Sequence, residues 1–224
     1  MKRTKLKDRI LPPYSRKEEW FNSISHMVGA VIGIIALVLC VVSAAEKRNI
    51  YGIVGGAVFG LMMTVLYTIS AIYHALSAKL IAKKVMQILD HCTIFVLIAG
   101  TYTPITLCSV REYDEVLGWL LLALVWVPAI IGVALNAVDL KKYGIFSIIC
   151  YLAMGWCIIL IADKINEIFS REAFAFILAG GIAYTAGAVL YAIGSKKTIF
   201  HSVFHIFTVI GSLLHFFAIY LFII

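Results

Sequence analysis

Three histidines and one aspartate lie inside long apolar stretches of the chain, where ionisable residues are unusual. His201 and His205 are four residues apart at the start of the last stretch, and His74 closes an earlier one. Asp90 lies near the start of the stretch that follows His74. An ionisable side chain is costly to hold in lipid, so within a membrane it usually faces the protein interior and marks a functional site. These four residues are our first candidates.

Their types and spacing are typical of a metal site. Residues four apart on a helix lie on one face, with Cβ atoms about 5–6 Å apart, so His201 and His205 can bind one ion together. His74 would add a third nitrogen, and three protein nitrogens with an open fourth position are typical of catalytic zinc. Asp90 would hold or deprotonate the bound water, or orient an imidazole. Ser70, one turn before His74, would donate a hydrogen bond to a developing oxyanion.

Spacing alone leaves other interpretations open. An isolated histidine in a membrane protein more often forms a hydrogen bond between helices than a bond to a metal. Calcium is disfavoured because it prefers several carboxylate and carbonyl oxygens. Three imidazoles favour zinc, although iron and manganese stay possible from the sequence.

For the other three histidines we favour structural roles. His91 adjoins the aspartate but points about 100° away from it on a regular helix. His215 is about 15 Å deeper than the histidine pair by helical rise, too far to share an ion. His26 follows Glu19 and Asn22 at helical spacings and is expected to cap or line the mouth of the site.

Composition predicts an integral membrane protein. Hydrophobic residues make up 62% of the 224 residues, charged residues only 14%, and the mean hydropathy is +1.00. Soluble domains contain about 45–50% apolar residues. Polar residues are nearly confined to a basic head, residues 1–22, and to short gaps, so residues 23–224 should form one membrane domain. The cysteines form no C-x-x-C pair, and we interpret them as buried apolar residues: Cys40, Cys92, Cys108, Cys150 and Cys157.

A bilayer core requires about 20 apolar residues per helix. The sequence offers seven such runs, with approximate limits 23–45, 51–76, 86–108, 116–136, 144–162, 173–194 and 199–222. The first run is too long for the core of a cleavable signal and should remain as a transmembrane helix. We therefore predict an all-α bundle of seven transmembrane helices. Recurring glycines, among them Gly29, Gly33, Gly56 and Gly60, predict close packing between helices of one bundle.

The basic residues predict an orientation. If the head and the second, fourth and sixth gaps share one side, that side holds 14 of the 19 lysines and arginines. They are Lys2, Arg3, Lys5, Lys7, Arg9, Arg16, Lys17, Lys79, Lys83, Lys84, Lys141, Lys142, Lys196 and Lys197. The positive-inside rule then gives a cytoplasmic N-terminus and an external C-terminus. Because the charges are spread over every inner gap, we exclude nucleic acid as a partner.

Several motifs resemble a known family. S-I-S-H at 23–26, S-A-I-Y-H at 70–74, D-H-C-T-I-F-V-L-I-A-G-T-Y-T-P at 90–104 and H-S-V-F-H-I-F at 201–207 resemble the bacterial hemolysin III family. That family is similar to the progestin and adipoQ receptor proteins, within a superfamily of membrane hydrolases that includes alkaline ceramidases. The resemblance covers essentially the whole chain after the head.

The resemblance implies a seven-helix fold with the N-terminus inside, in a bacterial cell membrane. It also implies that His74, His201 and His205 bind zinc, that Asp90 contacts the ion through water, and that Ser70 belongs to the same site. The wider superfamily implies hydrolysis of lipid amides, whereas haemolytic activity is attributed to some bacterial members. The receptor branch adds signalling, but the external gaps here are too short to form a docking domain for a protein ligand.

Two functions remain, with membrane lipids as the partner in both. The first is a zinc-dependent hydrolase of a lipid amide or ester. The alternative is a non-enzymatic membrane-active, homeostasis or sensor protein in which zinc is structural and any cytolysis follows from altered membranes. A transporter or channel is disfavoured because no second intramembrane charge defines a pathway.

Overall fold

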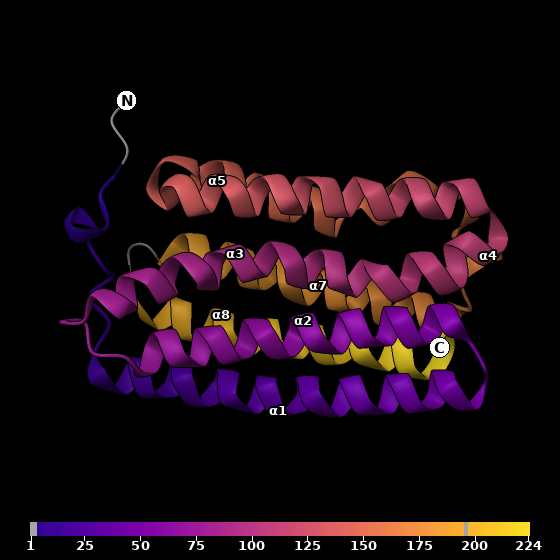
Figure 1. The fold of residues 1–224 in the computed structure, drawn as a ribbon, viewed down its shortest axis with the longest axis horizontal. Coiled ribbons are helices and arrows are strands. Elements are labelled where there is room, and N and C mark those ends of the chain that lie inside the picture. Colours follow the sequence, from indigo (N-terminus) through magenta and orange to yellow (C-terminus); the bar gives the residue numbers. More distant parts are fainter. Residues whose placement is uncertain (1–3, 195–196) are drawn as a thin grey trace.

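The computed structural model describes residues 4–194 and 197–224. All the regular secondary structure of these residues is helical. The long helices lie side by side in one bundle (Figure 1). The long helices are α1 (Arg16–Glu46), α2 (Ile50–Ala75), α3 (Ile81–Pro104), α5 (Glu115–Gly155), α7 (Arg171–Gly194) and α8 (Ile199–Ala218). Lys2, Arg3 and Lys196, which contribute to the predicted orientation, lie outside the described residues.

Shorter helical segments join or extend the long ones. They are a 3₁₀ turn (Leu6–Asp8), a π-helical turn (Ile105–Val110), α4 (Arg111–Tyr113), a 3₁₀ segment (Cys157–Lys164), α6 (Ile165–Ile168) and a final π-helical turn (Ile219–Ile223). In the part of the chain that the structure describes, six helical stretches are long and apolar enough to cross a membrane. The predicted all-helical membrane fold is confirmed at this level.

Helix α1 begins earlier than the apolar pattern indicated. It starts at Arg16 instead of residue 23, because Ser15 and Glu18 form a capping box. The Glu18 backbone N–H donates to the Ser15 hydroxyl, and the Ser15 N–H donates to the Glu18 carboxylate. A capping box satisfies two amide groups that a helix start otherwise leaves unpaired. The extra turns carry Glu19 and Asn22 into the bundle.

Helix α5 consists of two helical arms that meet at Asp139, whose φ of −158° and ψ of 90° are not helical. The Ser147 hydroxyl donates to the Asn136 side chain at 2.7 Å, and the Asn136 amide donates to Tyr151 at 3.3 Å. On a straight helix these partners would be about 16–22 Å apart. The two arms of α5 are therefore antiparallel.

Asp139 itself begins the second arm. Its carboxylate accepts hydrogen bonds from the backbone N–H groups of Lys141 at 3.1 Å and Lys142 at 3.2 Å. This is the geometry of a helix N-cap, for which aspartate is among the preferred residues. The second oxygen of the same carboxylate accepts from the Thr4 backbone N–H at 2.8 Å, so the N-terminal segment is fixed at this turn.

The two ends of the described chain lie at opposite ends of the bundle (Figure 1). At one end the Arg9 side chain donates to Gln87, near the start of α3, at 3.2 Å. At the other end the Lys47 ammonium, just after α1, donates to the carbonyl of Ile224. Between Arg9 and Ile224 the chain therefore passes along the bundle an odd number of times.

Glycines bring α1 and α2 into close contact, as the sequence predicted. A Cβ placed on Gly33 would lie 2.8 Å from the backbone nitrogen of Thr64, and one on Gly60 would overlap the backbone of Leu37. Small residues at such crossings let helix backbones approach closely in a membrane.

We expect Gly60→Ala to destabilise the protein, because its added methyl group meets backbone instead of a movable side chain. Forced overpacking of this kind costs about 1–3 kcal/mol. Thermal unfolding in detergent should show a clear loss. The matched control is Gly144→Ala, since nothing lies within 4 Å of a Cβ at that position. Equal stability of the two variants would contradict this interpretation of the helix contact.

Candidate metal centre

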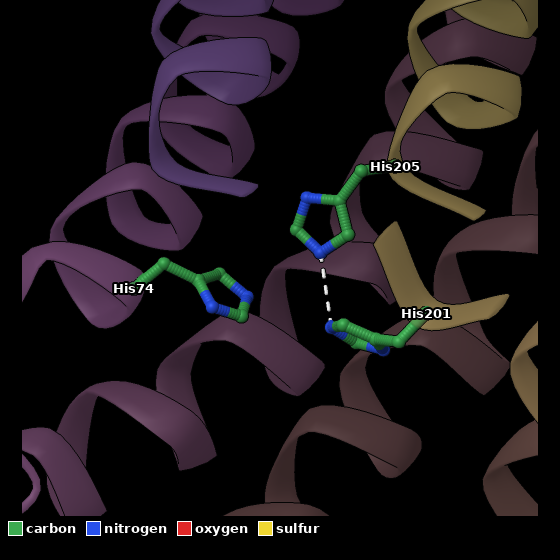
Figure 2. Close-up of side chains that lie close together, drawn as sticks. All are labelled: His74, His201 and His205. Carbon is green, nitrogen blue, oxygen red and sulfur yellow. Dashed lines mark hydrogen bonds between the residues drawn. The ribbon is translucent and has the colours of Figure 1, made fainter. Parts of the chain in front are cut away.

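Three of the predicted residues converge at one end of the bundle (Figure 2). His74 lies in the last turn of α2, and His201 and His205 lie in the first turns of α8. One ligand nitrogen of each ring lies within 4.8 Å of the others. The three residues are only 2%, 6% and 1% exposed. Three buried imidazoles in this arrangement can hold a metal ion.

His74 is held by a carboxylate from α1. Its Nδ1 is 2.7 Å from the Glu19 Oε2 atom, and its Nε2 is buried without a hydrogen-bond partner. The ring therefore has one nitrogen committed to the protein and one left for a ligand.

His201 and His205 occupy the i and i+4 positions of α8, as expected. Their Nε2 atoms are 3.0 Å apart, so both rings direct the same nitrogen into the cluster. The His205 ring stacks on His26 of α1 with a centroid separation of 3.8 Å. The stacking fixes the plane of His205, and the Nδ1 atom of His205 is buried without a partner.

Tyr14, which precedes α1, packs over the cluster. Its ring stacks on His201 at a centroid separation of 4.8 Å and lies 5.7 Å from His74. Burial raises the pKa of the Tyr14 hydroxyl above its ordinary value, so the group stays neutral and keeps its proton. Sequence reasoning missed Tyr14 because it assigned the whole head to the aqueous side.

A cavity of about 650 Å³ extends from this end into the bundle. Ser70, Asp90 and His205 all line it, whereas His74 and His201 do not. Most of its wall is apolar, with side chains from α3, from both arms of α5, and from α7. Ile145 and Leu178 belong to this wall and are exposed apolar residues.

Asp90 lies beside the cluster without joining it. Among the described residues, the grouping of ligand atoms within 4.8 Å contains the three histidines alone. The Asp90 carboxylate lies 3.6 Å from Nδ1 of His91, contrary to the expected divergence of these two side chains. A rotation of 100° between neighbours on a helix separates their Cβ atoms, but a side chain that bends back along the helix can still approach its neighbour. The His91 Nδ1 also lies 2.9 Å from the carbonyl of Gln87.

The three remaining histidines stay outside the cluster. His91 contacts α7, where its Nε2 lies 3.1 Å from the Tyr191 hydroxyl. His215 lies deeper in the cavity wall and stacks on Tyr184. His26 lines the cavity as expected, and its Nε2 lies 3.3 Å from the Thr208 hydroxyl.

Comparison with known proteins identifies the family. The family model described as "Haemolysin-III related" matches residues 14–216. "Hemolysin-3" of Bacillus cereus is 36% identical over 203 residues, covering 91% of this chain and 90% of the relative. The "Hemolysin-3 homolog" of Bacillus subtilis (strain 168) is 34% identical over 206 residues, covering 92% and 94%.

A human protein is a more distant relative. The "Monocyte to macrophage differentiation factor" of Homo sapiens is 23% identical over 171 residues, covering 73% of this chain and 68% of the relative. The matched segment of the family model begins at Tyr14 and includes all three clustered histidines. The chain therefore belongs to the haemolysin-III-related family and, with its six apolar helical stretches, is a multi-pass protein of the cell membrane.

Proposed function

We propose that this protein is a zinc-dependent hydrolase that cleaves an amide or ester bond of a membrane lipid. The observation that carries the proposal is the buried histidine cluster beside a largely apolar cavity, which we infer opens to lipid at the exposed residues Ile145 and Leu178. A lipid tail fits such a cavity, because ligand sites are usually concave and mostly apolar with few polar groups. His205 belongs to both the cluster and the cavity wall, so a carbonyl bound in the cavity would lie beside the cluster.

The donor set fits zinc. Three imidazoles match the ligands of catalytic zinc sites and favour zinc over iron or manganese. His74 would bind through Nε2, which is buried without a partner, and His201 and His205 through the Nε2 atoms that face one another. Zinc in such a site supplies Lewis-acid activation of a water molecule and of a substrate carbonyl.

Unpaired buried polar atoms support a ligand at this end. Side-chain atoms of Asn22, His26, His74, Ser202 and His205 are buried without a hydrogen-bond partner, and only His215 adds another among the described residues. Buried polar groups are nearly always paired, so a group of exceptions requires a reason. A bound ion with ordered water would pair several of them.

Asp90 and Ser70 supply the remaining chemistry. The Asp90 carboxylate would accept a proton from the attacking water and return it to the leaving amine or alkoxide as the bond to the carbonyl carbon breaks. The Ser70 hydroxyl would donate a hydrogen bond to the carbonyl oxygen as negative charge develops on it. Both residues line the cavity that also contacts His205, which supports their access to one bound carbonyl.

We also propose seven membrane crossings with a cytoplasmic N-terminus. The antiparallel arms of α5 would cross separately, which adds a seventh crossing to the six apolar stretches. An odd number agrees with chain ends at opposite ends of the bundle. The excess of lysine and arginine at the N-terminal end supports the orientation. The histidine cluster would then lie near the cytoplasmic leaflet.

A second candidate is a membrane-active protein without turnover. The observation that favours it is the printed name of the two Bacillus relatives, hemolysin-3 and its homolog. In this case the histidine cluster would serve the stability of the bundle. Release of a trapped dye from liposomes, equal for wild type and His74→Ala, would favour this candidate over the hydrolase.

The proposed topology predicts which loops a membrane-impermeant thiol reagent reaches. Lys142→Cys should react only after cells are opened, whereas Glu167→Cys should react in intact cells. The native cysteines are buried or half-buried, so background labelling should be low. If α5 crossed only once, Lys142→Cys would lie within the bilayer and would stay unlabelled in both preparations.

Metal content provides the direct test of the cluster. Purified wild-type protein should contain about one zinc per chain, and His205→Ala should lose it, because two imidazoles rarely retain zinc against competition. Elemental mass spectrometry measures both. The matched control is His215→Ala, a buried histidine of the same helix outside the cluster, which should keep its zinc. Absence of zinc from the wild type would contradict the proposed function.

Substitution of Asp90 tests the proposed base. Asp90→Asn should keep its zinc but hydrolyse lipid amides or esters more slowly, by a factor of about 10²–10⁴, because the amide cannot accept the proton. Turnover of a fluorescent lipid amide in detergent micelles measures the change. Undiminished turnover with zinc retained would exclude Asp90 as the base.

A further inference from the structure

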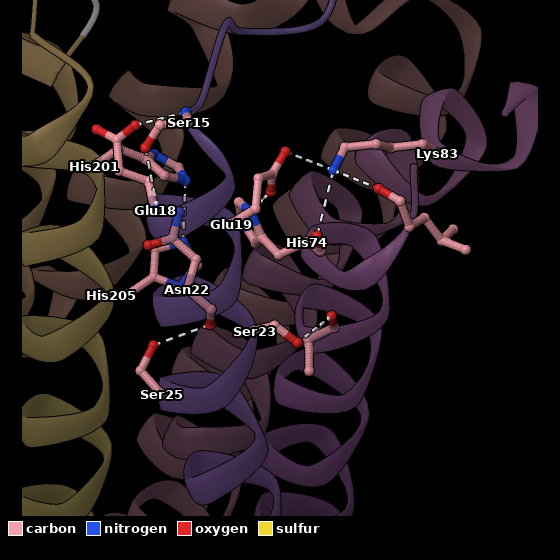
Figure 3. A network of polar contacts seen from close by, with 12 residues as sticks. Ser15, Glu18, Glu19, Asn22, Ser23, Ser25, His74, Lys83, His201 and His205 are labelled. Atoms are coloured by element: carbon pink, nitrogen blue, oxygen red, sulfur yellow. Dashed lines mark hydrogen bonds and ion pairs between the residues drawn. The ribbon is translucent and has the colours of Figure 1, made fainter. Parts of the chain in front are cut away.

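Glu19 joins three helices at the histidine cluster (Figure 3). One carboxylate oxygen, Oε2, lies 2.7 Å from Nδ1 of His74 at the end of α2. The other, Oε1, accepts a hydrogen bond from the Lys83 ammonium of α3 at 2.6 Å. Both oxygens of a single carboxylate from α1 are therefore engaged.

Lys83 is buried and committed to this contact. It is 2% exposed, and its ammonium group also donates to the backbone carbonyls of Leu76 at 2.9 Å and His74 at 3.4 Å. A lysine ammonium has three donors, and these three acceptors use them all. A buried charge is stable only when it is paired and hydrogen-bonded. Lys83 therefore holds Glu19 in place, and no other carboxylate pairs with it among the described residues.

The contact decides which nitrogen of His74 faces the cluster. When a carboxylate accepts a hydrogen bond from Nδ1–H, the neutral imidazole carries its lone pair on Nε2. In His74 the Nε2 atom is the one that is buried without a partner. A carboxylate in this position also fixes the orientation of the ring and increases the basicity of the ligand nitrogen.

We propose that Glu19 is a positioning residue that presents Nε2 of His74 to the metal ion, with Lys83 as the group that fixes Glu19. The inference rests on the proposed zinc site and goes beyond it, because it assigns a role to two residues that bind neither metal nor substrate. Glu19 acts through His74, so its loss weakens metal binding without removing a ligand.

The test compares zinc affinity in Glu19→Ala and Glu19→Gln by competition with a chelator of known affinity. Both are made in a Lys83→Met background, because glutamine has one carboxamide oxygen and, with the ammonium removed, that oxygen is free to accept from Nδ1–H of His74. Glu19→Ala should bind zinc about 10–100-fold more weakly, as found for such supporting residues. Glu19→Gln should stay within a few-fold of the Lys83→Met parent.

Two controls separate positioning from general stability. Glu18→Gln makes the same charge change one residue earlier, where the carboxylate caps α1 instead of contacting a histidine, and should leave zinc affinity unchanged. His74→Ala removes the ligand through which Glu19 acts, so in that background, with zinc supplied in excess to measure the residual affinity, Glu19→Ala should cause no further loss. A double-mutant cycle of this kind isolates the coupling between the two residues.

The outcomes distinguish this inference from the proposed function. Wild-type protein without zinc would overturn both. Zinc in the wild type, with Glu19→Ala binding it equally well, would overturn the positioning role alone. Equal losses in Glu19→Ala and Glu19→Gln, both in the Lys83→Met background, would overturn it too, because an oxygen that accepts from His74 would then make no difference to zinc affinity.

Discussion

The burial of three polar rings in an apolar bundle is the constraint on which the functional end depends. His74, His201 and His205 come from two helices that are distant in the sequence, and each is at least nine-tenths buried. A buried polar group without a partner costs about 1–3 kcal/mol. Helix α1 contacts two of these rings: Glu19 pairs with Nδ1 of His74, and His26 stacks on His205, whereas Nε2 of His74 and Nδ1 of His205 are left without a hydrogen-bond partner. The arrangement of α1, α2 and α8 at this end follows from those contacts.

Much of this site could be predicted from local patterns. The i, i+4 spacing places His201 and His205 on one helix face, and position within the apolar runs places His74 and Asp90 at a similar depth. Two residues at the same depth in a membrane need not lie close together. Asp90 lines the cavity, and the grouped ligand atoms of the described residues belong to the three histidines. The all-helical membrane fold was also predictable from the apolar runs, and the structure contains six helical stretches long enough to cross a membrane among the described residues, against the seven runs of the sequence.

The residues that support the cluster could not be found in this way, because their partners lie on other helices. In the sequence, Lys83 counts among the basic residues that indicate the cytoplasmic side of the membrane. In the structure it is buried against Glu19. Nothing in the spacing of these two residues, 64 positions apart, indicates a contact. The capping box at Ser15 did offer a local signal, since serine followed by glutamate three residues later marks a helix start. This signal would have placed the start of α1 directly after Ser15, with Glu19 inside the helix.

The N-terminal segment forms part of the cavity wall at its end of the bundle. Thr4, Arg9 and Ile10 line the cavity there. In the proposed function, the exposed residues Ile145 and Leu178 of the same wall would open the cavity toward lipid. A hydrophobic molecule entering by this side diffuses in two dimensions, and its encounter rate depends on its mole fraction in the bilayer. Occupancy would then depend on the affinity of the site and on the mole fraction of the molecule in the membrane, instead of on its concentration in the surrounding solution.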